Sequence, residues 1–409
     1  MISNTYKKKC LICEHNVNSF IEFGEMPIAN SFSKSINDNE YLFSMNMGFC
    51  ENCKMVQLLE QPERERMFHN NYAFFSSTSE YMKKHFYNFF LDLKKKQKLN
   101  QKSLVIEIGC NYGIFLENFT NEKIPCIGIE PSKNVAQVSR QKGINVIDGF
   151  FDQAMAKNII DEHGKADIIM SANVMCHIPY INSVFEGISL LLKKDGVFIF
   201  EDPYLGDVVK KNSFDQIYDE HVFLFSALSI KHLANKHKLE LVNVEHQITH
   251  GGSMRYTLAL KNNTKVNSNV LNLLAEETSL GLDKSLFYLD FEKNINQIKI
   301  ELIQLLKKLK KEGKKVVGYG ATSKSTTVIN YFNISRDLID CIFDTTPTKF
   351  YTFSPGKHIP VMPYSEFKKS NPDYVLLFAW NHANEIMQKE KDYMKNKHWI
   401  LYVPKVDIF

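Results

Sequence analysis

The sequence lacks the long apolar runs and the surplus charge that mark several common protein classes. No stretch of about 18 consecutive apolar residues exists, which excludes a transmembrane helix. No apolar segment follows the lysines at positions 7–9, so we expect no secretory signal and a cytoplasmic protein. Lys and Arg number 50 against 46 Asp and Glu, and this near balance argues against a dedicated nucleic-acid binder. We therefore expect neither a membrane nor a nucleic acid as a partner.

The composition that remains is that of a soluble globular protein. Of the 409 residues, 44% are apolar, 12% are aromatic and 23% are charged. At roughly 150 residues per domain the length corresponds to two or three domains. A net charge of only +4 together with many apolar residues argues against disorder.

Four of the eight cysteines form two CxxC pairs. Cys10 and Cys13 lie in CLIC, and Cys50 and Cys53 lie in CENC. Each pair places two thiolates on one tight turn, and two turns supply the four sulfur ligands that tetrahedral Zn²⁺ favours. Four thiolates leave no open coordination position, so we expect a structural zinc ion. Disulfides, which a reducing compartment disfavours, and a thioredoxin-like redox site are the alternatives.

Residues 103–202 alternate strand and helix patterns, which predicts a parallel sheet with helices on both faces. The first strand runs into Gly109-Cys110-Asn111-Tyr112-Gly113. A dinucleotide site requires GxGxxG, and Asn111 stands where its second glycine would be. Glu130 ends the next strand, where a carboxylate can accept both hydroxyl groups of a ribose. We therefore favour S-adenosylmethionine over NAD as the cofactor. The candidate cofactor-binding residues are Glu107, Gly109, Asn111, Gly113, Glu130, Asp148 and Asn173.

The run FDQIYDEH, residues 214–221, concentrates chemically active side chains. Tyr218, Asp219, Glu220 and His221 place a phenol, two carboxylates and an imidazole in four consecutive positions. The unperturbed pKa of histidine, near 6.5, suits proton abstraction at neutral pH. The alternative is the polar start of a helix with capping acids.

Three further positions have a functional and a structural interpretation each. His177 follows the fourth strand, where ligands bind in open α/β sheets, but it also fits a loop histidine bonded to backbone. Tyr72 belongs to a polar loop, residues 69–79, that either lines a pocket or simply packs. In HGGSMRY, residues 250–256, the glycines favour close approach of the backbone to a ligand, and a strained hairpin is the alternative.

The carboxyl-terminal third predicts a helix over residues 264–312 and then a second α/β unit. Its first strand leads into GYGATSKSTT, residues 318–327. No glycine precedes Lys324, which excludes a Walker loop, but backbone N–H groups, hydroxyls and an ammonium remain for an anion. We predict a small Rossmann-like domain that binds a phosphorylated ligand, with a purely structural α/β module as the alternative. The candidate substrate-binding residues are Tyr204, Gly318, Gly320, Ser323, Lys324, Lys349 and Asn381.

The motifs occur in the order CxxC…CxxC, ExGxxxG, CHIP, EDPYLGD…FDQIYDEH, HGGSMRY, GYGATSKSTT, DxxPxK…PGxxIPV and FAWN. This order resembles that of the zinc-containing, S-adenosylmethionine-dependent sugar C-methyltransferases, and the similarity covers nearly the whole chain. Members of that family act on nucleotide-linked 4-keto deoxysugars. One departure is Tyr351, where the family often has glycine.

The resemblance implies an α/β enzyme in three parts. These are a zinc-binding module (1–66), a Rossmann-like class I methyltransferase domain (67–263) with a helical lead-in over 67–100, and a linker helix with a smaller Rossmann-like domain that binds a nucleotide-diphosphate sugar (264–409). His221 is then the base, and the residues around the sugar are Tyr218, Glu220, His177 and Tyr72. A C4 ketone acidifies the hydrogen on C3, and the resulting carbanion attacks the methyl group of the cofactor. Methylation of an oxygen or nitrogen, or a non-catalytic zinc scaffold, would be the other hypotheses.

Overall fold

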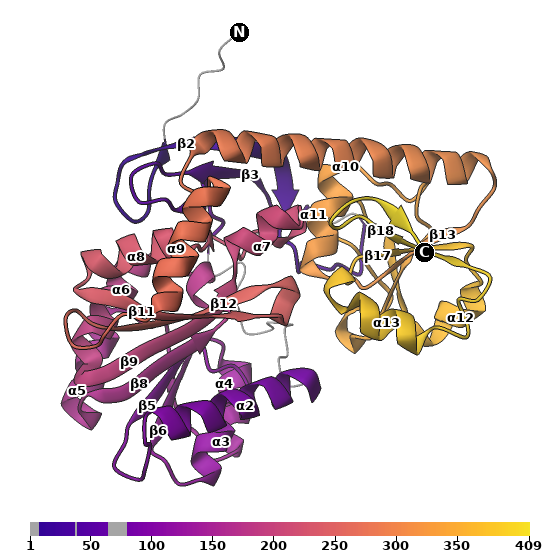
Figure 1. Ribbon diagram of the computed structural model, residues 1–409. Helices are drawn as coiled ribbons and strands as arrows, with labels where there is room; N and C mark the ends of the chain where they lie inside the picture. Colours follow the sequence, from indigo (N-terminus) through magenta and orange to yellow (C-terminus); the bar gives the residue numbers. More distant parts are fainter. Residues whose placement is uncertain (1–7, 37–38, 64–79) are drawn as a thin grey trace.

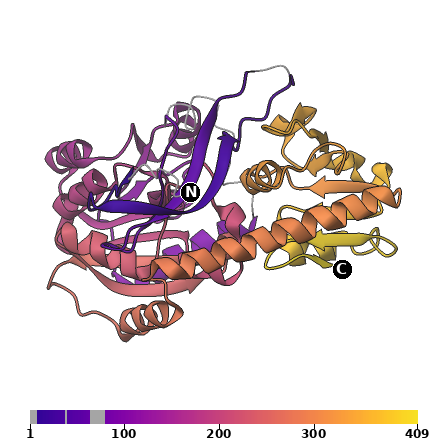
Figure 2. The ribbon, with the colours of Figure 1, turned by 90° about the horizontal axis from the view of Figure 1, so that it is seen from above.

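The computed structural model of the chain describes residues 8–36, 39–63 and 80–409. These residues form three sheets, here called the N-terminal, central and C-terminal sheets. The long helix α10 (Ser285–Lys311) extends from the N-terminal sheet to the C-terminal sheet (Figures 1 and 2). No helix of the described ranges combines the length and the apolarity that a membrane crossing requires.

The N-terminal sheet is antiparallel and takes its last strand from a distant part of the chain. Its order is β1-β2-β3-β4-β10. The bounds are β1 (Lys8–Lys9), β2 (Asn16–Pro27), β3 (Leu42–Phe49), β4 (Val56–Leu58) and β10 (Phe223–Leu224). Phe223 pairs with Gln57 and Leu224 with Val56, so the strand that directly follows the FDQIYDEH run completes this sheet.

The central sheet has seven strands in the order β11-β12-β9-β8-β5-β6-β7. The strands from β9 to β7 are parallel, and β12 runs antiparallel between β9 and β11. The bounds are β5 (Val105–Ile108), β6 (Cys126–Glu130), β7 (Asn145–Asp148), β8 (Ala166–Ala172), β9 (Leu192–Pro203), β11 (Leu239–Gln247) and β12 (Ser253–Leu260). The predicted parallel sheet is therefore present, and its central strands are buried on both faces, as their continuous apolar runs require.

Helices cover both faces of the central sheet. Asp152 caps the start of α5 by accepting from the backbone N–H of Met155, and Ser226 forms a capping box with Ser229 at the start of α8. The bounds are α2 (Glu80–Lys96), α3 (Leu116–Asn121), α4 (Lys133–Gln141), α5 (Gln153–His163), α6 (Ile181–Leu191), α7 (Leu205–Lys210) and α8 (Ala227–Lys236). Single-turn helices carry site residues beside these strands: η2 (Met175–His177), η3 (Phe214–Gln216) and η4 (Thr249–Gly251).

The C-terminal sheet is also mainly parallel, in the order β15-β16-β14-β13-β17-β18-β19 with antiparallel edge strands. Its strands are β13 (Val316–Tyr319), β14 (Ile342–Asp344), β15 (Thr352–Phe353), β16 (Pro360–Pro363), β17 (Tyr374–Leu377), β18 (His398–Leu401) and β19 (Asp407–Ile408). Its helices are α11 (Ser323–Tyr331), η5 (Pro347–Lys349), η6 (Tyr364–Glu366), α12 (Phe367–Ser370), η7 (Trp380–His382) and α13 (Ala383–Lys389). The arrangement is the Rossmann-like domain that the sequence predicts.

The connection between the central and C-terminal sheets differs from the single helix expected over residues 264–312. It consists of α9 (Ser268–Leu280) and α10. Gly281 ends α9 in the left-handed conformation with φ +87°, so the chain turns there instead of continuing the helix. The apolar stripe of α10 joins one core with side chains of the N-terminal and C-terminal sheets. The three sheets therefore do not have three separate cores.

Candidate active site and metal centre

The four cysteines of the two CxxC pairs converge in the N-terminal region. The Sγ atoms of Cys10 and Cys53 lie 3.4 Å apart, and those of Cys13 and Cys50 lie 3.5 Å apart. Tetrahedral zinc with Zn–S bonds near 2.3 Å places its sulfurs about 3.8 Å apart, which is close to this geometry.

The two turns that carry these cysteines have matching backbones. The carbonyls of Cys10 and Cys50 accept from the N–H groups of Glu14 and Lys54, at 2.9 and 2.8 Å. Both of these acceptor turns end on a residue of positive φ. Three of the sulfurs belong to buried residues, and the donor set of four thiols fits a structural zinc ion.

The glycine turn after β5 lies where the sequence predicts a cofactor. Gly109 and Gly113 have φ values of 73° and 66°, a region that other residues rarely adopt. A Cβ atom at Gly109 would lie 2.5 Å from Val174, and one at Gly113 would lie 2.2 Å from Ile144. The turn therefore requires both glycines. Asn111 lies between them, and its backbone N–H donates to Glu130 at 3.0 Å.

Two buried carboxylates beside this turn suit a ligand with a cation and a ribose. Glu107 is 4% exposed, and its Oε2 has no hydrogen-bond partner among the described residues. Burial and the charge of Glu130 raise the pKa of Glu107 well above its usual value. Glu130 also accepts from the backbone N–H of Ser132 at 2.8 Å, which fixes its carboxylate at the end of β6. A ligand ammonium would give the buried Oε2 of Glu107 a hydrogen-bond and charge partner, so the site fits S-adenosylmethionine.

The remaining candidate cofactor residues lie at the ends of neighbouring strands. Asp148 stands next to Glu130 in the sheet register and forms an ion pair with Arg140 at 2.5 Å. Asn173 follows β8 with a positive φ of 56°, and its Nδ2 donates to Nε2 of His250 at 3.2 Å. His250 also has a positive φ, 55°. Two non-glycine residues in this sparsely populated region therefore face each other, an arrangement typical of functional sites.

The candidate base is held in one tautomer. Nδ1 of His221 lies 2.6 Å from the carbonyl oxygen of Gln216. Because a carbonyl oxygen only accepts, Nδ1 carries the proton and the lone pair of the neutral ring is on Nε2. The hydroxyl of Tyr218 donates to that nitrogen at 2.8 Å, and the two ring centroids are 4.1 Å apart. The ring of His177 lies 5.2 Å from that of His221. His221, Tyr218 and His177 thus form one cluster.

Burial keeps these imidazoles neutral. It lowers the pKa of His177 to about 4, and burial followed by the charges of His177 and Lys324 lowers the pKa of His221 well below its usual value. Burial and the ammonium of Lys324 also lower the pKa of His250, to about 3. A neutral His221 holds its lone pair available as a proton acceptor across the neutral pH range.

The loop that carries His221 is held by all three parts of the chain. Residues 217–222 form no helix, so the polar helix start considered as an alternative is absent. From the N-terminal region, the backbone N–H of Ala29 donates to Asp219 at 2.9 Å and the amide of Asn30 donates to Glu220 at 2.8 Å. From α11, the hydroxyl of Thr327 donates to the carbonyl of Ile217 at 2.8 Å. Tyr72, predicted to approach the same group, lies outside the described residues.

The candidate substrate residues of the C-terminal part occupy several environments. Both glycines of its first turn pack against the end of β17: a Cβ at Gly318 would lie 2.8 Å from Phe378, and one at Gly320 would lie 2.9 Å from Ala379. Ser323 and Lys324 begin α11, where the cap Thr322 accepts from the N–H of Ser325.

Two lysines of the C-terminal part lie near carboxylates of the segment 214–221. Burial raises the pKa of Asp215 to about 6, and the half-buried ammonium of Lys324 is close enough to oppose that rise. Lys349 donates to the carbonyl of Ala321 at 2.7 Å and lies over the ring of Phe32 at 4.6 Å. Asn381 lies in η7, beside Trp380.

Tyr204 has a partner away from the loop that carries His221. Its hydroxyl donates to the buried carboxylate of Glu277 at 3.0 Å, and Glu277 also accepts from the backbone N–H groups of Ala227 and Leu228 at the start of α8. The structure therefore brings the Tyr204 hydroxyl to a helix start, where burial raises the pKa of Glu277 to about 7.

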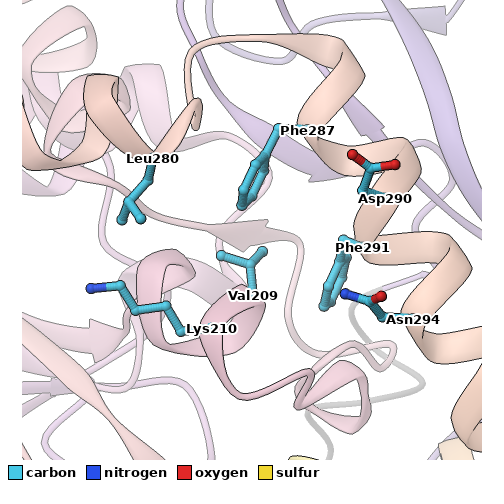
Figure 3. A pocket seen from close by; sticks show the side chains of 7 residues that line it. All are labelled: Val209, Lys210, Leu280, Phe287, Asp290, Phe291 and Asn294. Atoms are coloured by element: carbon cyan, nitrogen blue, oxygen red, sulfur yellow. The ribbon is translucent and has the colours of Figure 1, made fainter.

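The pocket drawn in Figure 3 lies elsewhere. It has a volume of about 210 Å³ and lies between α7, the end of α9 and α10. Its lining residues are Val209, Lys210, Leu280, Phe287, Asp290, Phe291 and Asn294. None of the candidate catalytic, cofactor or substrate residues lines this pocket.

Sequence reasoning missed several residues that shape the site. Asn30 is separated from Glu220 by 190 positions, and no local pattern indicates their contact. Asp202, at the end of β9, is 0% exposed and neither carboxylate oxygen has a hydrogen-bond partner among the described residues. Burial raises its pKa to about 8. The two consecutive carboxylates, Glu201 and Asp202, that follow the apolar run of β9 are the signal that could have identified it.

Comparisons with known proteins agree with this geometry. Residues 10–68 match the family described as "Putative zinc binding domain", residues 76–244 match "Methyltransferase domain", and residues 248–404 match "C-methyltransferase C-terminal domain". A curated protein of Streptomyces niveus, "C-methyltransferase NovU", is 30% identical over 392 residues, which cover 95% of this chain and 93% of that protein.

Solved structures of methyltransferases are similar over part of the chain. A SAM-dependent methyltransferase from Anabaena variabilis is 18% identical, with a TM-score of 0.34 over 42% of this chain and 84% of that one. An S-adenosylmethionine-dependent methyltransferase from Clostridium acetobutylicum is 12% identical, with a TM-score of 0.35 over 46% of this chain and 94% of that one.

Proposed function

The chain belongs to the family of zinc-containing, S-adenosylmethionine-dependent C-methyltransferases, and from this premise we propose that it methylates C3 of a nucleotide-linked deoxysugar that carries a ketone at C4. In this proposal residues 1–66 hold zinc, residues 67–263 bind the cofactor and residues 264–409 bind the nucleotide. The observation that carries the proposal is the geometry of His221. A transfer to carbon requires a carbanion, and a carbanion requires a base.

His221 is the base in this proposal. Nδ1 of His221 is fixed on the carbonyl of Gln216, so the lone pair is on Nε2, on the side of Tyr218. When the substrate is bound, Nε2 takes the proton from C3. The Tyr218 hydroxyl, which donates to Nε2 before the substrate binds, becomes the donor for the enolate oxygen. A neutral His177 adds a second donor beside it. Glu220, held by Asn30, and Tyr72 contribute to orienting the sugar.

Residues of the glycine turn and of the neighbouring strand ends would hold S-adenosylmethionine in this proposal. When bound, S-adenosylmethionine supplies an electrophilic methyl group on a sulfonium ion. Glu107 binds the cofactor ammonium, and Glu130 accepts from the ribose hydroxyls, with Asn111 and Asp148 beside them. Gly109 and Gly113 shape the turn, and Asn173 borders it from β8. Fixing donor and acceptor in one orientation reduces the entropic part of the barrier.

The C-terminal part binds the anionic half of the substrate in this proposal. The N-terminus of α11, with Ser323 and Lys324, presents backbone N–H groups and an ammonium to a diphosphate. Lys349 approaches from the opposite loop, and Asn381 leaves the end of β17. Gly318 and Gly320 keep this turn tight, and Tyr204 supports the helix start at α8 behind the sugar site.

Solvent deuterium exchange tests the carbanion. Nucleotide-linked 4-keto sugars are incubated in D₂O without cofactor, and mass spectrometry follows the gain of one deuterium at C3. We expect exchange with the wild type and its loss in His221→Ala, while His163→Ala, an exposed histidine on α5, leaves it intact. Full methylation with no exchange under any condition would contradict the mechanism, because a concerted attack on carbon has no free carbanion.

A further inference from the structure

We propose that Trp380 is a positioning residue for the base: by fixing the Asp215–Gln216 peptide, it makes the C-terminal part of the chain orient His221 for proton abstraction. The inference rests on the proposed function of His221. It gives the C-terminal part a role in the chemical step, in addition to the nucleotide binding proposed above.

The first line of support is a set of hydrogen bonds on two consecutive residues of η3, Asp215 and Gln216. The indole Nε1 of Trp380, on η7, donates to Oδ2 of Asp215 at 2.6 Å. Asp215 is 0% exposed, and the same oxygen accepts from the hydroxyl of Tyr402 at 2.6 Å. The next residue on η3 is Gln216, whose carbonyl oxygen accepts from Nδ1 of His221. Two donors of the C-terminal part are thus one residue away from the carbonyl that selects the tautomer of the base.

The second line of support is packing on the other side of the same peptide. The side-chain amide of Gln216 donates to the carbonyl of His250 at 2.5 Å. His250 precedes Gly251, and a Cβ at Gly251 would lie 2.5 Å from the Trp380 ring. The indole therefore contacts both holders of Gln216: the neighbouring carboxylate by a hydrogen bond and the η4 turn by its ring. The glycine at position 251 is what allows this approach.

Removing the Trp380 donor should change the orientation of the buried carboxylate of Asp215, which has few other hydrogen-bond donors. Oδ1 of Asp215 has no hydrogen-bond partner among the described residues. The buried carboxylate therefore depends on the two donors that bind its Oδ2. Without the indole N–H, the carboxylate turns toward the ammonium of Lys324, which already interacts with it. Such a turn moves η3 and with it the carbonyl of Gln216. The Nδ1–H of His221 then loses its fixed acceptor, and the lone pair on Nε2 is no longer held toward the substrate.

The test uses the two tryptophans of the chain. Trp380→Phe removes the N–H donor, and its smaller ring also lacks the indole atoms that contact Gly251, so both links of Trp380 to the Gln216 peptide are lost. Trp399→Phe is the matched control, because Trp399 is 4% exposed in β18 and packs against Tyr319. ¹⁵N NMR of histidine-labelled protein reports the tautomer of His221, assigned with His221→Ala. Deuterium exchange at C3 and steady-state kinetics report kcat and KM separately.

We expect Trp380→Phe to lose the single Nδ1–H tautomer signal of His221 and to slow C3 exchange by about tenfold or more, with KM changed less than kcat. Trp399→Phe should leave both readouts within about twofold of the wild type. An unchanged His221 signal and exchange rate in Trp380→Phe would overturn the proposal, and so would a rise in KM alone. If wild-type protein shows no exchange at all, the proposed function fails, while the NMR comparison still decides whether Trp380 sets the tautomer.

Discussion

Replacing Cys10 by serine should disorder the loop that carries His221, some 200 positions away in sequence. The serine hydroxyl is a poor zinc ligand, and structural zinc sites contribute about 10–16 kcal/mol of apparent binding free energy. That is as large as the about 5–15 kcal/mol by which a typical domain is stable, so loss of zinc should unfold the N-terminal sheet. The chain 222–224 pairs with this sheet, and Leu58 donates to the carbonyl of Val222 at 2.8 Å.

The expected loss of order in the loop that carries His221 follows from the hydrogen bonds that are lost. The N-terminal region holds the loop by three hydrogen bonds: Leu58 with Val222, Ala29 with Asp219, and Asn30 with Glu220. At about 1 kcal/mol net for each, their loss costs about 3 kcal/mol, or roughly a hundredfold in the population of the ordered loop. We therefore expect a fall in C3 exchange of roughly that factor.

Two measurements check this without relying on turnover alone. Metal analysis should find one zinc per wild-type chain and none in Cys10→Ser. Amide hydrogen exchange should accelerate in the peptide 217–224, far from the mutation in sequence. Cys341→Ser is the control, since Cys341 is a half-buried cysteine outside the metal cluster. Metal-free Cys10→Ser protein with normal protection of that peptide would refute the reasoning.

Three further predictions concern titrating groups. Glu107→Gln should weaken S-adenosylmethionine binding by about tenfold in calorimetry, whereas Glu117→Gln should not. Because burial raises the pKa of Glu107, binding of the cofactor to the wild type should also release a proton. That release would make the measured heat of binding depend on the buffer. The pKa of Glu277 is raised from 4.5 to about 7, so the folded state binds an extra proton between these values. The stability from this group is fully present below pH 4.5 and is lost as the pH rises through 7, by about 3 kcal/mol, and Glu277→Gln should remove that slope in denaturation curves. The acid limb of the C3 exchange rate should lie below pH 6.5, because burial lowers the pKa of His221; a limb at 6.5 would mean that another group is the base.

Local patterns were sufficient to predict the elements that depend on local chemistry. The two CxxC turns, the glycine turn after β5 and the stripe of α10 are each encoded within a few residues, and each is present. The alternation of strands and helices likewise predicted both parallel sheets. Hydrophobic periodicity and turn chemistry act over the same short range as the patterns that reveal them.

The contacts that assemble the site could not be predicted in this way. His221 is positioned by the carbonyl of Gln216, which any residue at that position would supply, and by a loop that Asn30 and Thr327 hold from opposite ends of the chain. Tyr204 is a further example, because its place after a strand end predicts a ligand group but does not reveal the hydrogen bond from its hydroxyl to Glu277. Such partners are fixed by tertiary packing, on which neighbouring sequence carries no signal.

The strand β10 also bears on the order in which the chain is made. Residues 16–58 leave the ribosome before residues 223–224, so the edge of β4 stays unpaired until those residues have been synthesised. The contacts of Ser33 with Phe353 and of Glu40 with Gly356 come later still. An open strand edge invites pairing with other chains, so the nascent protein passes through a long aggregation-prone interval. The pairing of β2 with β3 and of β3 with β4, and the zinc site, need no later residue, so the availability of zinc during translation should affect how much of the protein reaches the folded state.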